Sequence, residues 1–140
     1  MSMAENHFTG HLPQGLCQSR VLQNLFVNEN MLTGSIPRDL KNCSSLFQAS
    51  FSGNQFTGKL SKMFGVYPNL EIMELSNNNF YGELSTNLGR CPRLISLKIE
   101  ENNISGRIPP EIGNLTRLVE FNLYSNYLIG DIPKEFGKLT

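Results

Sequence analysis

The chain has 140 residues, the size of one domain, with 12 basic and 12 acidic residues and a formal net charge of zero. Nucleic acids and anionic membranes both need a basic stripe, and no block of like charge stands out here, so we expect neither nucleic acid nor direct membrane contact. No run of about 18 apolar residues occurs, which excludes a membrane span within this sequence.

The first residues, Met1 to Glu5, lack the charged-then-apolar pattern of a secretory signal. The repeat pattern is nevertheless already under way at Asn6. We therefore expect the chain to be an excised or truncated piece, with any signal peptide lying upstream of it.

Asn and Gly return together every 24 residues along the chain. The six pairs are Asn6 and Gly10, Asn30 and Gly34, Asn54 and Gly58, Asn78 and Gly82, Asn102 and Gly106, and Asn126 and Gly130. A fixed period of about 20–29 residues with leucine-type positions before an Asn is typical of a leucine-rich repeat solenoid. We predict that residues 1–140 form a single array of about six repeats, the first and last partial and without caps. Such arrays build binding surfaces, so we expect no enzyme and no cofactor.

Five segments ahead of the asparagines share the pattern Leu-x-x-apolar-x-apolar and predict short strands: 22–27, 46–51, 70–75, 94–99 and 118–123. Side chains alternate between two faces of a strand, so one set points inward and the other outward. Stacking these strands gives a parallel sheet on the concave side of an α/β repeat solenoid. Each Asn can then place its amide on backbone groups of its own turn and of the next repeat, forming a ladder.

The residues after each Gly predict the convex side. An apolar residue is followed by Pro13, Pro37, Pro109 or Pro133, whereas Ser61 and Ser85 stand there in the middle repeats. Two further inward positions follow, three residues apart (as in Leu40 and Cys43), a spacing that suits 3-10 or short helical turns.

The pattern Asn-x-apolar-x-Gly-x-Ile-Pro, as in residues 30–37 and 102–109, resembles the plant-specific leucine-rich repeat. That repeat occurs in the ectodomains of plant receptor-like kinases, in receptor-like proteins and in polygalacturonase-inhibiting proteins. Details such as Leu16-Cys17 and the run from Tyr67 to Leu70 look most like the large peptide-sensing receptor kinases, particularly the MDIS1-interacting receptor-like kinase group. The resemblance covers essentially the whole chain and implies a right-handed superhelix with an additional short sheet beside the main one.

The resemblance implies a ligand- or protein-binding segment of a receptor kinase ectodomain, on the extracellular face of the plasma membrane. Its partners would be a peptide or protein ligand and a leucine-rich repeat co-receptor. The alternative is a segment of a secreted, apoplastic inhibitor or defence protein of the polygalacturonase-inhibitor type. The Arg-x-Arg clamp with which some such receptors hold a ligand's carboxylate is missing, so we expect that carboxylate to be held elsewhere.

Outward strand positions form the predicted ligand-binding floor. The candidate contacts are Phe26, Asn28, Ile72, Glu74, Lys98, Glu100, Glu120, Asn122 and Tyr124. Large apolar residues on a polar sheet can be contact anchors or ordinary surface residues. The floor's C-terminal half is acidic and suits a ligand segment that carries Lys or Arg, although solvent screens such pairs.

Two histidines, His7 and His11, are spaced like a metal pair, but they flank a turn and have no third ligand nearby in sequence, so we predict no metal site.

Among the cysteines, Cys17 falls two residues from the Cys43 column of the adjacent repeat. Since neighbouring repeats lie about 4.8 Å apart, we predict a Cys17–Cys43 disulfide and a buried free thiol at Cys91.

Asn42, Asn103 and Asn114 begin glycosylation sequons, and the first and last share one convex column.

Solenoids need polar caps, and the sequence leaves Leu12 and Leu16 bare at one end and Phe136 and Leu139 at the other. We therefore expect the isolated chain to self-associate end to end or to fray at its termini.

Overall fold

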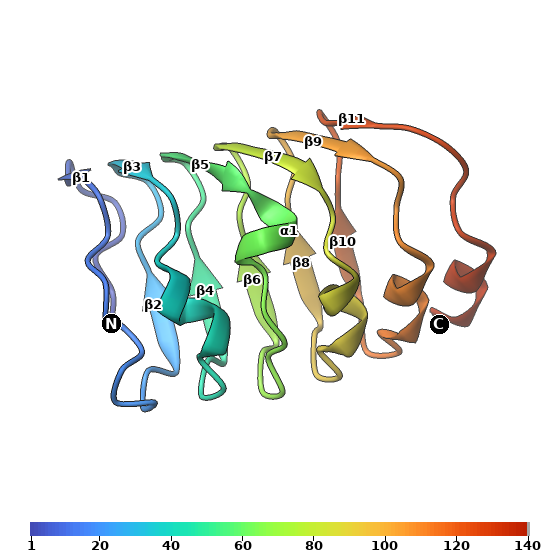
Figure 1. Ribbon diagram of the computed structural model, residues 1–140, viewed down its shortest axis with the longest axis horizontal. Coiled ribbons are helices and arrows are strands. Elements are labelled where there is room, and N and C mark those ends of the chain that lie inside the picture. Colours follow the sequence, from blue (N-terminus) through green and yellow to red (C-terminus); the bar gives the residue numbers. More distant parts are fainter. Residues whose placement is uncertain (140) are drawn as a thin grey trace.

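The computed structural model describes residues 1–139, which form a stack of successive turns of chain (Figure 1). Two parallel sheets run along the stack. The five-stranded sheet, in the order β2-β4-β6-β8-β10, consists of β2 (Asn24–Phe26), β4 (Gln48–Ser50), β6 (Ile72–Glu74), β8 (Ser96–Lys98) and β10 (Glu120–Asn122). The six-stranded sheet, in the order β1-β3-β5-β7-β9-β11, consists of β1 (Thr9–Gly10), β3 (Met31–Gly34), β5 (Gln55–Lys59), β7 (Asn79–Glu83), β9 (Asn103–Gly106) and β11 (Tyr127–Leu128). The predicted main sheet and additional short sheet are both confirmed.

Strand pairing follows the sequence period in the main sheet. Phe26 pairs with Ser50 and Ser50 with Glu74, so partners stand one 24-residue repeat apart. A bridge between Ser2 and Phe26 carries the same register to the start of the chain. Equivalent side chains of successive repeats therefore lie side by side in continuous rows.

Buried asparagine amides join consecutive repeats. In Asn78, the Nδ2 group donates to the carbonyls of Leu75 (3.2 Å) and Ser76 (3.1 Å) and to that of Phe51 (3.0 Å) in the preceding repeat. Its Oδ1 atom accepts the Phe56 N–H, also of the preceding repeat, at 2.9 Å. The same four bonds recur at Asn30, Asn54, Asn102 and Asn126. The predicted ladder exists, but it reaches back to the preceding repeat and not forward to the next.

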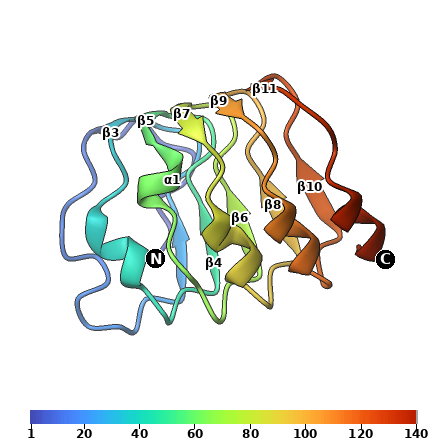
Figure 2. The same ribbon diagram turned by 45° about the vertical axis from the view of Figure 1, so that its right-hand side comes forward.

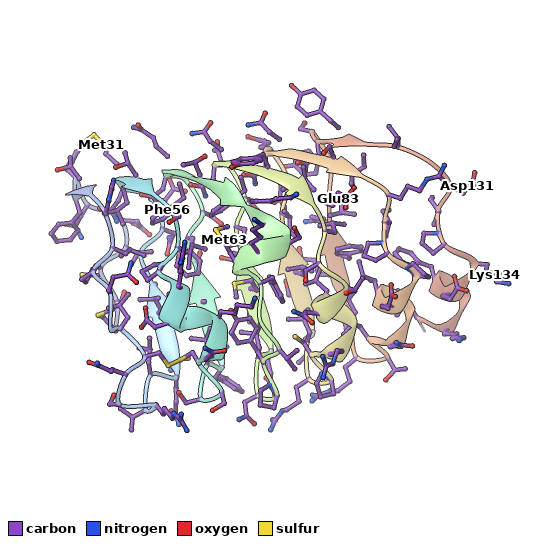
Figure 3. All side chains as sticks on the ribbon, in the orientation of Figure 1. Met31, Phe56, Met63, Glu83, Asp131 and Lys134 are labelled. Carbon is purple, nitrogen blue, oxygen red and sulfur yellow. A yellow bond between two sulfur atoms is a disulfide. The ribbon has the colours of Figure 1, made fainter. Side chains whose placement is uncertain are left out.

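The core lies between the sheets and the convex turns. Phe56 stacks on Phe80 with ring centroids 6.3 Å apart, and Phe51 meets Phe56 edge-on at 5.8 Å. Near the N-terminal end of the stack, Cys17 and Cys43 form the predicted disulfide with a Cα–Cα distance of 5.6 Å (Figure 3). Cys91 is a buried free thiol, as predicted.

The convex side carries short helical turns, which confirms the expectation from the spacing. They are η1 (Arg38–Asn42), α1 (Leu60–Met63), η2 (Thr86–Arg90), η3 (Pro110–Asn114) and η4 (Lys134–Lys138). The third repeat is irregular, because α1 begins at Leu60, two residues before Lys62, which is the equivalent of Arg38. In Figure 1 the green coil of α1 accordingly sits above the row of the other coils, closer to the six-stranded sheet.

Ser61 accounts for this shift. Proline disfavours a helical conformation of the residue before it, and prolines hold the N-cap positions of η1, η3 and η4. Without proline at position 61, Leu60 is free to enter the helix. Ser85 also replaces proline, but its side chain accepts the Asn87 N–H at 3.2 Å and so caps η2 at the regular position.

The ends of the stack differ from the prediction in part. Leu12 is buried, not bare, because one neighbouring repeat is enough to cover it, whereas Leu16, Phe136 and Leu139 are partly buried. Large apolar side chains stay exposed near both ends, among them Met1 and Phe8 at one end and Ile129 and Ile132 at the other. End-to-end association therefore stays a prediction. Within residues 1–139 no helix has the length and apolar character to cross a membrane.

Replacing Asn78 by Ala should lower the free energy of unfolding by about 3 kcal/mol or more, because the change leaves buried backbone groups of two repeats unpaired. Asn6 is exposed, and within the described residues its side chain donates only to the carbonyls of Met3 and Ala4 of its own turn, so Asn6→Ala should lower it by about 0.5 kcal/mol or less. Urea denaturation measures both values. Similar losses in the two variants would contradict the ladder's role.

Candidate functional site

The outward-facing side chains of the five-stranded sheet, which we call the concave floor, form three rows. The first row is Asn24, Gln48, Ile72, Ser96 and Glu120; the second is Phe26, Ser50, Glu74, Lys98 and Asn122; the third, just past the strands, is Asn28, Ser52, Ser76, Glu100 and Tyr124. The strand register thus brings all nine predicted contact residues onto one surface. Neighbours in a row are about 4.8 Å apart, the spacing of hydrogen-bonded strands. Figure 2 shows this sheet passing behind the convex coils.

Lys98 bridges two carboxylates at the centre of the floor. Its Nζ atom lies 3.4 Å from Glu74 Oε1 and 3.4 Å from Glu120 Oε2. Partial burial opposes the charge of Lys98, but the two carboxylates outweigh it and raise the pKa of this ammonium group. Two carboxylates and one ammonium leave one negative charge here, so the acidic field at this point is weaker than a count of the glutamates suggests.

Each of these carboxylates is also held by a serine of the preceding repeat. Ser50 Oγ donates to Glu74 Oε2 and Ser96 Oγ to Glu120 Oε2, both at 2.9 Å. The Ser96 bond is the main cause that lowers the pKa of Glu120, partial desolvation opposes it, and Lys98 assists. These serines were not among the predicted contact residues, although each stands one repeat before a glutamate in the sequence.

Glu100 departs most from expectation. Its position suggests an exposed floor carboxylate, yet it is only 9% exposed. Ser76 holds the same position one repeat before Glu100. Within the described residues, Glu100 Oε2 and Ser76 Oγ are both buried without a hydrogen-bond partner. Unpaired buried polar atoms are rare in folded proteins. The pair marks a place on the floor where a hydrogen-bond donor would be stabilised.

Tyr124 lies beside Glu100 in the same row and is 60% exposed. Partial desolvation of its hydroxyl and the charges of Glu100 and Glu101 raise the pKa of Tyr124. The ring can therefore offer an aromatic face to a ligand next to a carboxylate, an arrangement that suits a cation.

The remaining candidates are spread over the floor. Phe26 on β2 and Ile72 on the central strand β6 are half-buried and supply apolar surface, and Asn28 is also half-buried. Asn122 Nδ2 contacts Glu120 Oε1 at 3.4 Å and extends the charged group. The floor thus runs from mostly uncharged to charged along the stack.

The other predicted positions lie elsewhere. His7 and His11 are exposed, and the ring of His11 lies over Gly34 in the next repeat. The sequon residues Asn42 and Asn114 are exposed at the ends of η1 and η3, and Asn103 is exposed at the start of β9. None of these residues belongs to the concave floor.

Ser96→Ala and Lys98→Met should each raise the pKa of Glu120 towards its ordinary value, because the serine hydrogen bond and the lysine both lower it. A depressed folded-state pKa stabilises the fold above the ordinary carboxyl pKa of about 4.3, and this contribution is lost as the pH falls through the folded-state value. Carbon-13 NMR titration of the side-chain carboxyl measures the pKa, with Lys134→Met as a control that removes a distant cation. An unchanged pKa in both floor variants would contradict the network.

Comparisons with known proteins fit this geometry. The profile of the family described as Leucine Rich Repeat matches residues 21–43, 69–91, 93–115 and 117–139. No match was found among curated protein sequences.

Solved structures give closer parallels. The ectodomain of the Arabidopsis receptor kinase HAESA, in complex with an N-terminally extended IDA peptide hormone, has a TM-score of 0.95 and 33% identity over 99% of this chain and 23% of its own. The structure of HAESA in complex with IDA and the co-receptor SERK1 has a TM-score of 0.90 and 31% identity, over 99% of this chain and 23% of its own. The structure of PEPR1 with AtPEP1 has a TM-score of 0.93 and 30% identity, over 99% of this chain and 19% of its own.

The chain spans about a fifth of the length of these receptor ectodomains. Its repeats carry the two sheets, the convex turns and the asparagine ladder that the family profile and the structural likeness lead one to expect. The chain belongs to the leucine-rich repeat family, with repeats of the kind found in plant receptor kinase ectodomains.

Proposed function

We propose that this chain is a peptide-binding segment of a plant receptor kinase ectodomain and that its concave floor contacts the ligand. The observation that carries the proposal is the pair of buried, unpartnered atoms on that floor, Glu100 Oε2 and Ser76 Oγ. The likeness to HAESA and PEPR1, whose solved structures contain the peptides IDA and AtPEP1, supports it. As part of such a receptor the segment would lie on the extracellular face of the plasma membrane.

The floor selects for a ligand that carries a cation beside an apolar residue. An ammonium or guanidinium group can donate to the carboxylate of Glu100 and leave a second donor for an adjacent acceptor. The terminal torsion of a glutamate is broad, so a small rotation presents the covered oxygen to a ligand. Tyr124, exposed beside it, adds an aromatic face for the same cation.

Apolar contact lies further along the rows. Phe26 and Ile72 are half-buried; Phe26 lies on β2, at the N-terminal side of the charged group, and Ile72 lies on β6, the strand that also carries Glu74. A peptide that crosses the strands would therefore meet Phe26 first, and then Ile72 together with the carboxylates. Aromatic and large aliphatic side chains are the usual sources of binding energy at such contacts.

Selection from a displayed random peptide library, with the wild-type chain as bait, tests this proposal. Enriched peptides should carry Lys or Arg near an apolar residue. Glu100→Gln should weaken their binding by about tenfold, because a charged hydrogen bond becomes a neutral one of the same shape. The matched control is Glu135→Gln on the convex turn η4, which makes the same charge change away from the floor. Neutral or acidic peptides, or equal binding by Glu100→Gln, would overturn the assignment.

An extracellular location predicts glycans on the convex side. Asn42 and Asn114 are exposed at equivalent places on η1 and η3, so a glycan on either leaves the concave floor open. When the chain is secreted from plant cells behind a signal peptide, we expect both residues to carry N-glycans, which mass spectrometry of glycopeptides detects. Cytosolic expression is the control. Secreted protein unmodified at both positions would count against an extracellular route.

A further inference from the structure

A second surface feature lies beside α1, on the opposite side of the stack from the concave floor. It is a hollow of about 620 Å³, which we call the α1 hollow, lined by Ser35, Ile36, Arg38, Lys41, Gly58, Lys59, Ser61, Lys62, Met63 and Tyr81. Its volume falls within the range of about 300–1,000 Å³ found for ligand pockets. It therefore has room for a short segment of a partner.

The irregular third repeat creates this hollow. Elsewhere on the convex side η2, η3 and η4 pack on one another in consecutive repeats, whereas α1 packs on β5 and β7. The displaced helix leaves a gap in the row of turns, next to η1, and Met63 extends from α1 at this place (Figure 3). The Gly58 backbone that leads into α1 also differs, with φ of 128° where the equivalent Gly34 and Gly82 have 78° and 81°.

The lining of the hollow is strongly cationic. Arg38, Lys41, Lys59 and Lys62 contribute four positive charges, and no lining residue is acidic. None of the four forms an ion pair within the described residues, where the four ion pairs involve other cations. The nearby carboxylate of Asp39 points away, since its Oδ2 atom accepts the Cys17 N–H at 3.0 Å. In a chain with zero net charge, this concentration of unpaired cations favours an anion.

The hollow also offers apolar surface. Ile36 and Met63 are partly buried in its wall, and Tyr81 is 50% exposed at its edge. Carboxylates would meet the lysines and the arginine while an aliphatic side chain covers the apolar wall. A sugar acid or a free inorganic anion has no side chain for that wall, so the combination favours a peptide.

We propose that the α1 hollow binds an acidic peptide segment of a protein partner, in which Asp or Glu residues flank an aliphatic residue. This site is independent of the concave floor, which favours the opposite charge. The chain can therefore engage a basic segment on one face and an acidic segment on the other.

Fluorescence anisotropy with a labelled Glu-Leu-Glu-Glu peptide at low ionic strength tests the proposal. Lys59→Glu combined with Lys62→Glu should weaken binding by about tenfold. The matched control is Arg107→Glu combined with Lys134→Glu, which reverses charge at the same two repeat positions in regular repeats and should change binding by less than about twofold. Glu100→Gln on the concave floor should leave binding of this peptide unchanged, so failure here and failure of the floor proposal are distinguishable.

Ser61→Pro tests the geometry with all four cations kept. Proline at position 61 disfavours a helical Leu60, so the turn should move to the regular position, close the gap and weaken binding of the peptide. A thermal melt checks that this variant folds. The proposal would be overturned if both charge-reversed pairs weakened binding equally, or if Ser61→Pro left binding unchanged. It would also be overturned if trigalacturonate or inorganic sulfate bound more strongly than the peptide.

Discussion

Side-chain amides buried between repeats bind backbone groups of two repeats at once, and the rest of the structure depends on this interaction. An amide supplies donors and an acceptor from one short side chain, which neither Asp nor Leu can do. Two of the four bonds of Asn78 go to its own repeat, at Leu75 and Ser76. The other two go to the preceding repeat, at Phe51 and Phe56. Because the geometry recurs at the five asparagines from Asn30 to Asn126, any insertion between them would break it, which explains the strict 24-residue period.

The constant register has different consequences on the two faces. On the concave floor it aligns Ser50, Glu74 and Lys98 in one row, where each side chain contacts a neighbour from the adjacent repeat. On the convex side the turns are joined mainly by packing and are less constrained. At position 61 the chain has neither a proline nor a side-chain cap, and there α1 is displaced and a cationic hollow opens while both sheets stay continuous.

Most of the fold could be predicted from the sequence, because period and polarity fix which residues are inward in every repeat. The strands, the ladder and the pairing of Cys17 with Cys43 follow from position in the repeat alone. The shift of α1 could not be predicted in this way, since Ser61 and Ser85 look alike in the sequence. They differ in structure because only Ser85 caps the following turn, through the Asn87 N–H.

The candidate site was predictable only as a set of outward positions. Which of those side chains pair depends on lateral distances that periodicity does not contain: Lys98 falls between Glu74 and Glu120, whereas Glu100 is buried and left unpaired.

The ladder that sets these distances can be tested most directly by amide hydrogen exchange at Phe56 and Phe80, whose N–H groups bond to the side chains of Asn78 and Asn102. If the ladder holds the repeats together, these amides should exchange as slowly as the central strand amides and through the same cooperative unfolding. Fast exchange at Phe56 and Phe80, while the strands stay protected, would show that the amide bonds open locally and do not set the spacing of the stack.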